Sequence, residues 1–369
     1  MPKVSVIVPL YRAKNFLVPC VSALKRQGIS DMEILLVDDC SPDDTYACAL
    51  ELFGNDEKVR VIRQAENGGP GKARNKGIEL AKGEYICFCD VDDLYVDGAV
   101  SGMLYEAERL DADVYCSNEF YLTVVDPLPD DLSVLPEANL LKVGFISMEE
   151  SRSEGKCEIA GSIKERMDLW LEHRYHWSVF GKIFKTDFLR AADIRFSDAR
   201  LGEDQLFMLK ALIKAGIYVD QVKATYIYRA GNTSSSSRGS GNPGVFLDAE
   251  RAIFKSIDVI DDAVRNIPFF DEHPEYTDRL KAFHIKGLED GYAVPKFLQI
   301  GRAALSRNEA VEALFSEYFG TKGSFVKKTL FDAYGGRSAD ASFEAFVAYE
   351  NLKKLQEAAQ GFFSLLPQG

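Results

Sequence analysis

Apolar runs alternate with helical periodicities along the first third of the chain. Short runs rich in β-branched and aromatic residues predict strands at residues 4–8, 34–37, 59–62, 85–89 and 113–116. Between these runs, apolar residues recur with the 3.6-residue period of a helix. Alternating strands and helices with short connections predict an α/β fold with a mostly parallel sheet and helices on both faces. We expect ligands to bind beyond the carboxyl ends of the strands.

A helix start is predicted directly after the second strand. Ser41 can serve as the N-cap residue, Pro42 suits the first helical position, and Asp44 is an acid at the third position. This order of residues is typical of a capping box, so we expect the next helix to begin there.

The pattern changes in the rest of the chain. It becomes irregular over residues 120–164, as in the Pro- and Asp-rich stretch 126–131, and regular signals return at 177–185. A stretch rich in Ser, Gly and Asn at 231–244 is typical of a loop or linker. Helical stripes follow, with apolar positions between 246 and 264 and again between 343 and 362. We therefore expect an α/β domain at 1–244 and a helical C-terminal region at 245–369.

Composition and charge narrow the classes of function. With 46% hydrophobic and 27% charged residues, the 369-residue chain has an ordinary globular composition. A formal net charge of −13 argues against a nucleic-acid partner and against broad adhesion to anionic membranes, because both need an excess of Lys and Arg. A phosphate-bearing small ligand is still compatible, since a divalent cation can neutralise it within an acidic protein.

The cellular setting is also predicted from the sequence. Seven cysteines without paired spacing indicate reduced thiols. The apolar stretch 4–8 is too short for the core of a signal peptide, and no run of about 18 apolar residues could span a bilayer. We expect a cytoplasmic protein and leave peripheral contact with the inner face of the membrane open.

The first candidate site is the segment Asp90-Val91-Asp92-Asp93, which follows the most continuously apolar strand. Side chains two residues apart on an extended chain point the same way, so Asp90 and Asp92 can address one site. Mg²⁺ and Mn²⁺ prefer carboxylate oxygens and share their coordination shell with substrate phosphates. The sequence therefore predicts a site for Mn²⁺ or Mg²⁺ at Asp92 and Asp90. The alternative is a solvated acidic turn.

Further polar candidates stand at the ends of the first two strands. Asp38 and Asp39 follow the second strand, and Tyr11 follows the first. A carboxylate can accept hydrogen bonds from the N–H of a pyrimidine or from a ribose hydroxyl, and Tyr11 offers a ring for stacking. We expect Asp39 to contact the base, whereas for Asp38 a role in the turn after the strand is equally compatible.

A glycine-rich segment at 66–75 invites comparison with a phosphate-binding P-loop. Glu66 stands where that motif needs Gly, and Ala73 stands where it needs Ser or Thr, so the segment does not match a P-loop. A glycine-rich turn before a helix can still direct backbone N–H groups at an anion, and Lys72 and Arg74 add positive charge. The alternative is an ordinary loop with a surface arginine.

Two acids, Glu203 and Asp204, follow Gly202 at a predicted helix start. Negative charge is stabilised at a helix N-terminus, which is the simplest explanation for such a pair. The functional alternative is that one of them accepts a proton from an attacking hydroxyl group, as general-base catalysis requires.

Taken together, these segments resemble the inverting family 2 glycosyltransferases, which have the GT-A fold. The resemblance covers residues 2–235 in five ordered motifs, with looser matches at 177–185 and 226–229. The motifs lie at residues 4–11, 36–45 (with Cys40 where the family commonly has Gly), 67–75, 90–93 and 202–204. By this resemblance, residues 1–118 would bind the nucleotide sugar and residues 119–244 the acceptor.

The resemblance also implies roles for single residues. Asp204 would be the catalytic base and Glu203 a supporting or acceptor-binding group. The implied donor-binding residues are Pro9, Tyr11, Asp39, Lys72, Arg74, Asp90, Asp92 and Arg229. Of these, Asp39 would contact the base, Asp90 the ribose, and Asp92 the metal that bridges the diphosphate.

The implied function is transfer of a sugar from a nucleotide diphosphate sugar, such as a UDP-sugar, to an acceptor hydroxyl with inversion. The acceptor would be a saccharide or a lipid-linked saccharide in the synthesis of a bacterial surface polysaccharide. The resemblance does not extend to the C-terminal helices, for which assembly into a homo-oligomer is left open.

Two other functions fit the same fold class. A nucleotidyltransferase that makes sugar nucleotides would need a glycine-rich loop after the first strand, where this chain has Pro9-Leu10-Tyr11-Arg12. A non-catalytic subunit that binds nucleotide sugars would bind the donor without transferring or hydrolysing it.

Overall fold

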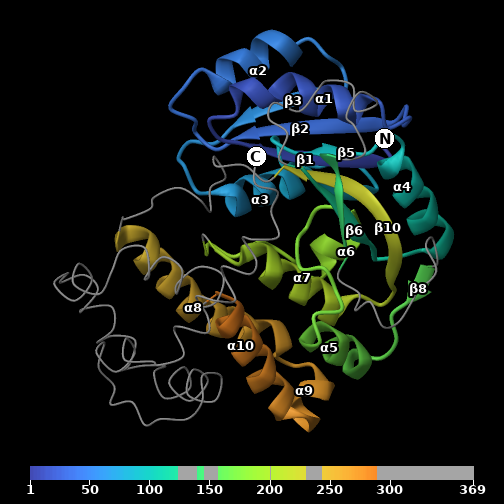
Figure 1. Ribbon diagram of the computed structural model, residues 1–369, viewed down its shortest axis with the longest axis vertical. Helices are drawn as coiled ribbons and strands as arrows, with labels where there is room; N and C mark the ends of the chain where they lie inside the picture. The colour runs from blue at the N-terminus through green and yellow to red at the C-terminus, as the bar shows by residue number, and fades with distance from the viewer. Residues whose placement is uncertain (124–138, 145–156, 200, 230–242, 289–369) are drawn as a thin grey trace. The chain divides into compact units, whose positions relative to one another are not determined.

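The computed structural model describes residues 1–123, 139–144, 157–199, 201–229 and 243–288 (Figure 1). The chain separates into two compact units. The first consists of Met1–Asp198 and Glu203–Gly231, and the second of Ala199–Gly202 and Asn232–Gly369.

The first half of the sheet in the first unit is parallel. It contains β1 (Val4–Leu10), β2 (Met32–Asp38), β3 (Val59–Arg63) and β4 (Tyr85–Phe88), in the order β3-β2-β1-β4. These strands confirm the predicted apolar runs. Because they are parallel, their carboxyl ends lie along one edge, where Asp39 and Asp90 follow β2 and β4.

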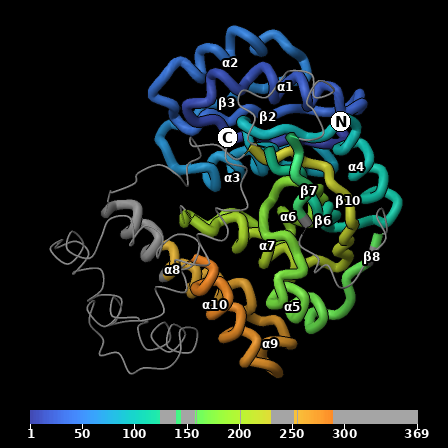
Figure 2. Tube along the Cα trace, in the orientation of Figure 1, coloured from blue at the N-terminus to red at the C-terminus, as the bar shows by residue number. Residues whose placement is uncertain are grey.

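The second half of the sheet is mixed. Strand β9 (Lys182–Lys185) pairs antiparallel with both β4 and β6 (Val114–Thr123), and β10 (Tyr218–Arg229) runs parallel to β6. Three short strands pair antiparallel with these, namely β5 (Leu94–Tyr95), β7 (Leu141–Gly144) and β8 (Cys157–Ile159). Figure 2 traces β6 and β10 side by side along this half.

Helices cover both faces of the sheet (Figure 1). On one face, Val4, Val6 and Val8 pack in a core with three helices, α1 (Leu17–Lys25), α2 (Thr45–Phe53) and α4 (Ala99–Leu110). The short helix η1 (Lys14–Phe16) directly precedes α1. Successive side chains of a strand alternate between faces, so Ile7 points to the other face, where it meets α3 (Pro70–Leu80). A Cβ atom at Gly77 would lie 2.4 Å from Ile7 Cγ2, so this close approach requires glycine.

Three further helices belong to the first unit. They are α5 (Ile163–Leu171), α6 (Thr186–Ala191) and α7 (Glu203–Lys214). Helix α5 begins with a capping box between Ser162 and Glu165. Helix α7 begins at Glu203, as predicted, and therefore carries both acids in its first turn.

The predicted helix start at Ser41 is wrong. Helix α2 begins at Thr45, and its N-cap residue Asp44 makes no capping hydrogen bond through its side chain. Ser41 instead belongs to the turn after β2, because its N–H donates to Asp38 Oδ2 (3.1 Å) and its Oγ accepts from the N–H of Arg12 (3.2 Å). The hydroxyl that would have capped the helix is thus used to join two strand ends.

In the second unit the structure describes α8 (Pro243–Val264), α9 (Pro268–Glu272) and α10 (Pro274–Leu288). Helix α8 confirms the predicted stripe, with Ile253, Ile257 and Ile260 buried. The helix predicted near 343–362, the irregular stretch 126–131 and most of the 231–244 loop lie outside the described residues. None of the described helices combines the length and apolarity needed to cross a membrane.

Candidate functional site

Arg74 joins two of the predicted acids. Its Nη1 donates to Asp204 Oδ1 (2.8 Å) and its Nη2 to Asp90 Oδ1 (2.7 Å), while Glu203 Oε1 lies 3.7 Å from Nη1. Only 4% of the Arg74 side chain is exposed, and its guanidinium lies over the ring of Phe196, 5.3 Å from the centroid. Helix α3 therefore brings the end of β4 and the start of α7 to one point.

The two acids of α7 differ in their electrostatic setting. Burial and the neighbouring Asp204 raise the pKa of Glu203 to about 8, so Glu203 holds a proton at neutral pH. Burial also raises the pKa of Asp204, but the direct ion pair with Arg74 and a hydrogen bond from the Val179 backbone N–H oppose that shift. Asp204 is therefore the acid of the pair that is better placed to be ionised and to accept a proton.

Asp39 organises the glycine-rich loop before α3. Its carboxylate accepts hydrogen bonds from the N–H groups of Gly68 (2.8 Å) and Gly69 (2.7 Å) and from Gln64 Nε2 (2.6 Å). Burial raises the pKa of Asp39, and the two backbone N–H groups oppose the rise. The backbone N–H groups that were predicted to face a bound anion thus donate to a carboxylate of the protein itself. Asp38 is buried and serves the turn at Ser41.

The loop after β4 is held by its last acid. Asp93 is buried and accepts hydrogen bonds from Tyr226 Oη (3.1 Å) and from the backbone N–H of Arg229 (2.8 Å). Burial and the charges of Asp92 and Asp90 raise the pKa of Asp93 well above its usual range. Asp93 is therefore a structural residue, and it leaves Asp90 and Asp92, each with about a third of its side chain exposed, on the open side of the loop.

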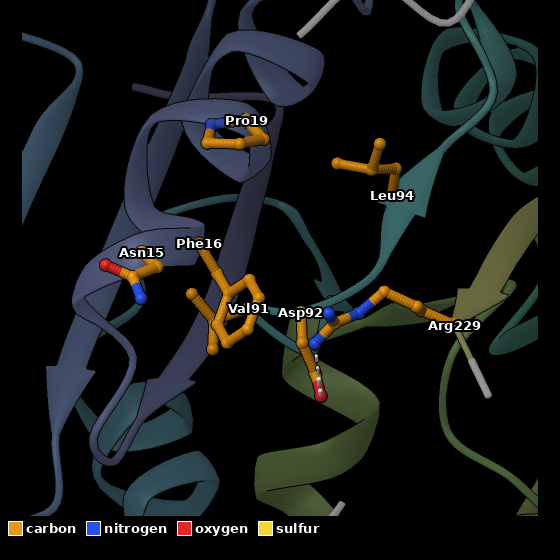
Figure 3. Close-up of a pocket in the computed structure, with 7 residues that line it drawn as sticks. All are labelled: Asn15, Phe16, Pro19, Val91, Asp92, Leu94 and Arg229. Carbon is orange, nitrogen blue, oxygen red and sulfur yellow. Dashed lines mark ion pairs between the residues drawn. The ribbon is translucent and has the colours of Figure 1, made fainter. Parts of the chain in front are cut away.

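Arg229 packs beside Asp92 at the end of β10. Its Nη2 lies 3.7 Å from Asp92 Oδ2, and its guanidinium lies 4.1 Å from the centre of the Phe16 ring. These residues belong to a small pocket, which is shown in Figure 3. The pocket is lined by Asn15, Phe16, Pro19, Val91, Asp92, Leu94 and Arg229.

Other predicted donor-binding residues lie at the same edge of the sheet or in the helix that follows the glycine-rich loop. Pro9 pairs with Val37 within the sheet, and Tyr11 is half-buried just beyond β1, with Arg12 over its ring. Lys72 is exposed and lies 3.6 Å from Glu66, whereas Arg74, two residues further along α3, points inward.

Some residues of the site were not predicted from the sequence. Asn75 and Phe196 are joined by two hydrogen bonds, and Val179 supplies a backbone donor to Asp204. Lys182 is fully buried on β9, where burial lowers its pKa and its Nζ donates to the carbonyl of Ser178 (2.6 Å). Asn75 and Lys182 could have been found from the sequence, because they lie in segments 67–75 and 177–185, which resemble motifs of the family.

The carboxylates of the site can be compared with the ligands that a divalent cation prefers. Within the described ranges, no three His, Cys, Asp or Glu side chains are grouped so that they could hold a metal ion by themselves. A Mg²⁺ or Mn²⁺ ion that takes one or two carboxylates and completes its shell with substrate phosphates needs no such group. Asp92 and Asp90 fit that requirement, because their carboxylates are partly exposed.

Comparison with known proteins agrees with this geometry. Residues 5–123 match the family described as glycosyl transferase family 2. The chain is 32% identical over 235 residues to the uncharacterized glycosyltransferase EpsJ of Bacillus subtilis (strain 168), covering 62% of this chain and 61% of EpsJ. It is 30% identical over 230 residues to the succinoglycan biosynthesis protein ExoO of Rhizobium meliloti (strain 1021), with the same two shares. The chain thus spans 61% of the length of these curated relatives.

A solved structure shows the same fold. The crystal structure of S. aureus TarS 1-349 in complex with UDP is similar with a TM-score of 0.55 at 20% sequence identity, covering 90% of this chain and 89% of that chain. The sheet and its flanking helices thus share the fold of this structure, in agreement with the predicted GT-A fold. The family matched over residues 5–123, glycosyl transferase family 2, is the one that the motifs predicted.

Proposed function

We propose that this protein transfers a sugar from a nucleotide diphosphate sugar to an acceptor hydroxyl with inversion at the anomeric carbon. The observation that supports this most strongly is the pair of hydrogen bonds from Arg74 to Asp90 and Asp204. Asp90, a candidate for donor binding, and Asp204, a candidate for activating the acceptor, are thereby bound by the same guanidinium group.

In the proposed reaction, Asp204 accepts the proton of the acceptor hydroxyl. The acceptor oxygen forms a bond to the anomeric carbon on one face of the sugar. The bond between that carbon and the diphosphate oxygen breaks on the opposite face, and its electron pair leaves with the nucleoside diphosphate. A single displacement of this kind inverts the configuration at the anomeric carbon. Glu203, protonated at neutral pH, can donate a hydrogen bond to the acceptor.

The donor would lie along the carboxyl edge of β1, β2 and β4. We assign the base to Asp39 and Tyr11, beside Pro9, and the ribose to Asp90. Lys72, Arg74 and Arg229 supply positive charge for the diphosphate. Mn²⁺ or Mg²⁺ would be held by Asp92 and Asp90, and when bound it would stabilise the negative charge of the leaving diphosphate. The UDP complex of TarS supports a UDP-sugar as the donor.

The acceptor is proposed to be a saccharide or a lipid-linked saccharide in the synthesis of a bacterial surface polysaccharide. The name of ExoO, a succinoglycan biosynthesis protein, supports this class of pathway. Residues 1–244 would form the catalytic part and residues 245–369 a helical region that serves assembly or acceptor binding.

Donor hydrolysis provides the direct test. The full chain is incubated with Mn²⁺ and a panel of UDP-, GDP- and dTDP-sugars, and the release of nucleoside diphosphate is measured. We expect release from one or more UDP-sugars. Binding of UDP without release from any donor would instead indicate a non-catalytic binding subunit, and failure to bind any nucleotide would refute the proposal.

A further inference from the structure

Trp177 is an exposed aromatic residue in an otherwise buried stretch of chain. Residues 175–184 are all buried except Trp177, of which 42% is exposed. Leaving a large apolar side chain in water forgoes the free energy that its burial would contribute. Trp177 is therefore the residue of this stretch whose side chain is accessible to a ligand.

The backbone on either side of Trp177 is fixed. The N–H of His176 donates to Asn118 Oδ1 (3.1 Å), and the carbonyl of Ser178 accepts from the buried Lys182 Nζ (2.6 Å). Trp177 is thus held between two anchored residues on a short connection into β9. A rigid aromatic side chain on a fixed backbone loses little conformational entropy when a ligand binds to it.

Trp177 is also close to the candidate catalytic base. Val179, two residues further along, donates its backbone N–H to Asp204. Two residues of extended chain span at most about 7 Å, so the Cα atom of Trp177 lies within that distance of the Cα atom of Val179. The backbone of Trp177 therefore lies in the same part of the first unit as the acid that would receive the acceptor proton.

We propose that Trp177 binds the acceptor sugar by stacking its indole ring against the apolar face of a pyranose. This inference rests on the proposed glycosyl transfer and assigns to it a residue that recognises the acceptor. The indole is flat and apolar, and the C–H groups on one face of a pyranose are apolar too, so contact between them removes both surfaces from water. The hydroxyl groups at the rim of the sugar stay available, and one of them is presented to Asp204.

A lipid surface is the other environment that accepts exposed indoles. The net charge of −13 opposes contact with anionic headgroups. Other exposed large apolar side chains come from different elements, such as Leu50 and Leu52 in α2, Tyr105 in α4 and Ile159 in β8. A single exposed tryptophan two residues from Val179, which donates to Asp204, suits a single sugar ring better than a membrane.

Tryptophan fluorescence can test the contact directly, because the chain has only two tryptophans and the other, Trp170, is buried. The full chain with bound UDP is titrated with methyl β-D-glucopyranoside, methyl β-D-galactopyranoside and methyl 2-acetamido-2-deoxy-β-D-glucopyranoside. We expect at least one glycoside to change the emission, and the change to be absent in Trp177→Phe, which retains Trp170. No change in the wild-type chain with any glycoside, or a change only with phosphatidylglycerol vesicles, overturns the proposal.

Kinetics with the glycoside that gives the largest response provide the second test. We expect Trp177→Ala to raise the KM for this acceptor roughly tenfold, which corresponds to about 1.4 kcal/mol of binding free energy. The Kd for UDP and the rate of donor hydrolysis should not change. Tyr105→Ala removes another exposed aromatic side chain and should leave every value unchanged.

The proposed glycosyl transfer and the role of Trp177 are refuted by different results. If the wild-type chain neither binds UDP nor releases it from a donor, the proposed function itself is wrong. If donor hydrolysis is normal and Trp177→Ala has the same acceptor KM as the wild type, only the role of Trp177 is refuted.

Discussion

Asn75 and Phe196 are joined by two hydrogen bonds of 2.9 Å, one from Asn75 Nδ2 to the carbonyl of Phe196 and one from the Phe196 N–H to Asn75 Oδ1. The amide side chain thus pairs with the backbone as a neighbouring strand would. Because Asn75 follows Arg74 in α3 and Phe196 lies under the guanidinium of Arg74, this pair fixes the surroundings of the charge at the centre of the site.

The first prediction concerns this pair. Asn75→Ala should lower the free energy of unfolding by about 1–3 kcal/mol, because it leaves a backbone donor and acceptor without their partner. It should also reduce turnover, since Phe196 would no longer be held beneath Arg74. Urea unfolding and donor hydrolysis measure the two effects. Lys76→Ala, which removes only a surface pair with Glu79, is the matched control and should change neither.

The second prediction concerns the proton acceptor. Asp204→Asn keeps the shape of the side chain but removes its basicity, so transfer should fall about 10²–10⁴-fold, the usual contribution of a general base. The Kd for UDP should not change. Asp187→Asn alters another acid in the first turn of a helix and should have no effect. Normal transfer by Asp204→Asn would exclude Asp204 as the base.

The third prediction concerns the metal. Asp92→Ala should weaken binding of Mn²⁺ in the presence of UDP, measured by calorimetry, and should abolish any stimulation of hydrolysis by Mn²⁺. Asp97→Ala removes a nearby exposed acid that pairs with Arg26 and should leave Mn²⁺ binding intact. Full wild-type activity in an excess of chelator would contradict the assignment of a metal to Asp92 and Asp90.

The fourth prediction concerns pH. The pKa of Glu203 is about 8 in the folded protein against an ordinary value of 4.5, so between these values the folded state binds more protons than the unfolded state. Its contribution to stability is therefore present at low pH and is lost as the pH rises through about 8.

Glu203→Gln imitates the protonated acid and should remove this loss. The difference in unfolding free energy between Glu203→Gln and the wild type should grow in favour of the variant from about pH 5 to pH 8. Its size should be on the order of a few kcal/mol, since one pKa unit corresponds to about 1.4 kcal/mol. Glu79→Gln changes an exposed acid on α3 and is the control. A difference that does not vary with pH would show that Glu203 is already ionised at low pH.

The strands that carry the site could be predicted because their apolar runs are short, continuous and bounded by polar residues. The order and direction of the later strands could not. Strand β9 pairs antiparallel with β4 and β6, and nothing in its four residues records those partners. Pairing between distant strands is set by how the whole sheet packs, so a local pattern carries little information about it.

The acids could be named from their motifs, but their partners could not. Asp38 and Asp39 are adjacent and chemically identical, yet one serves the turn at Ser41 and the other the loop at Gly68. The link from Arg74 to Asp204 spans 130 positions of sequence, and only the folded chain brings them to 2.8 Å. By contrast, the exposure of Lys72 and the burial of Arg74 agree with the helical period, because residues two apart on a helix lie on different faces.

The contact between Gly77 and Ile7 has a bearing on which variants of this protein stay active. Helix α3 can approach β1 so closely only because residue 77 has no side chain, and Arg74 lies three residues before it on the same helix. Any larger residue at 77 would lift the helix and draw the guanidinium away from its acids, although position 77 would meet no ligand. A survey of natural or engineered variants that scores only residues lining the site would overlook a position that sets its dimensions.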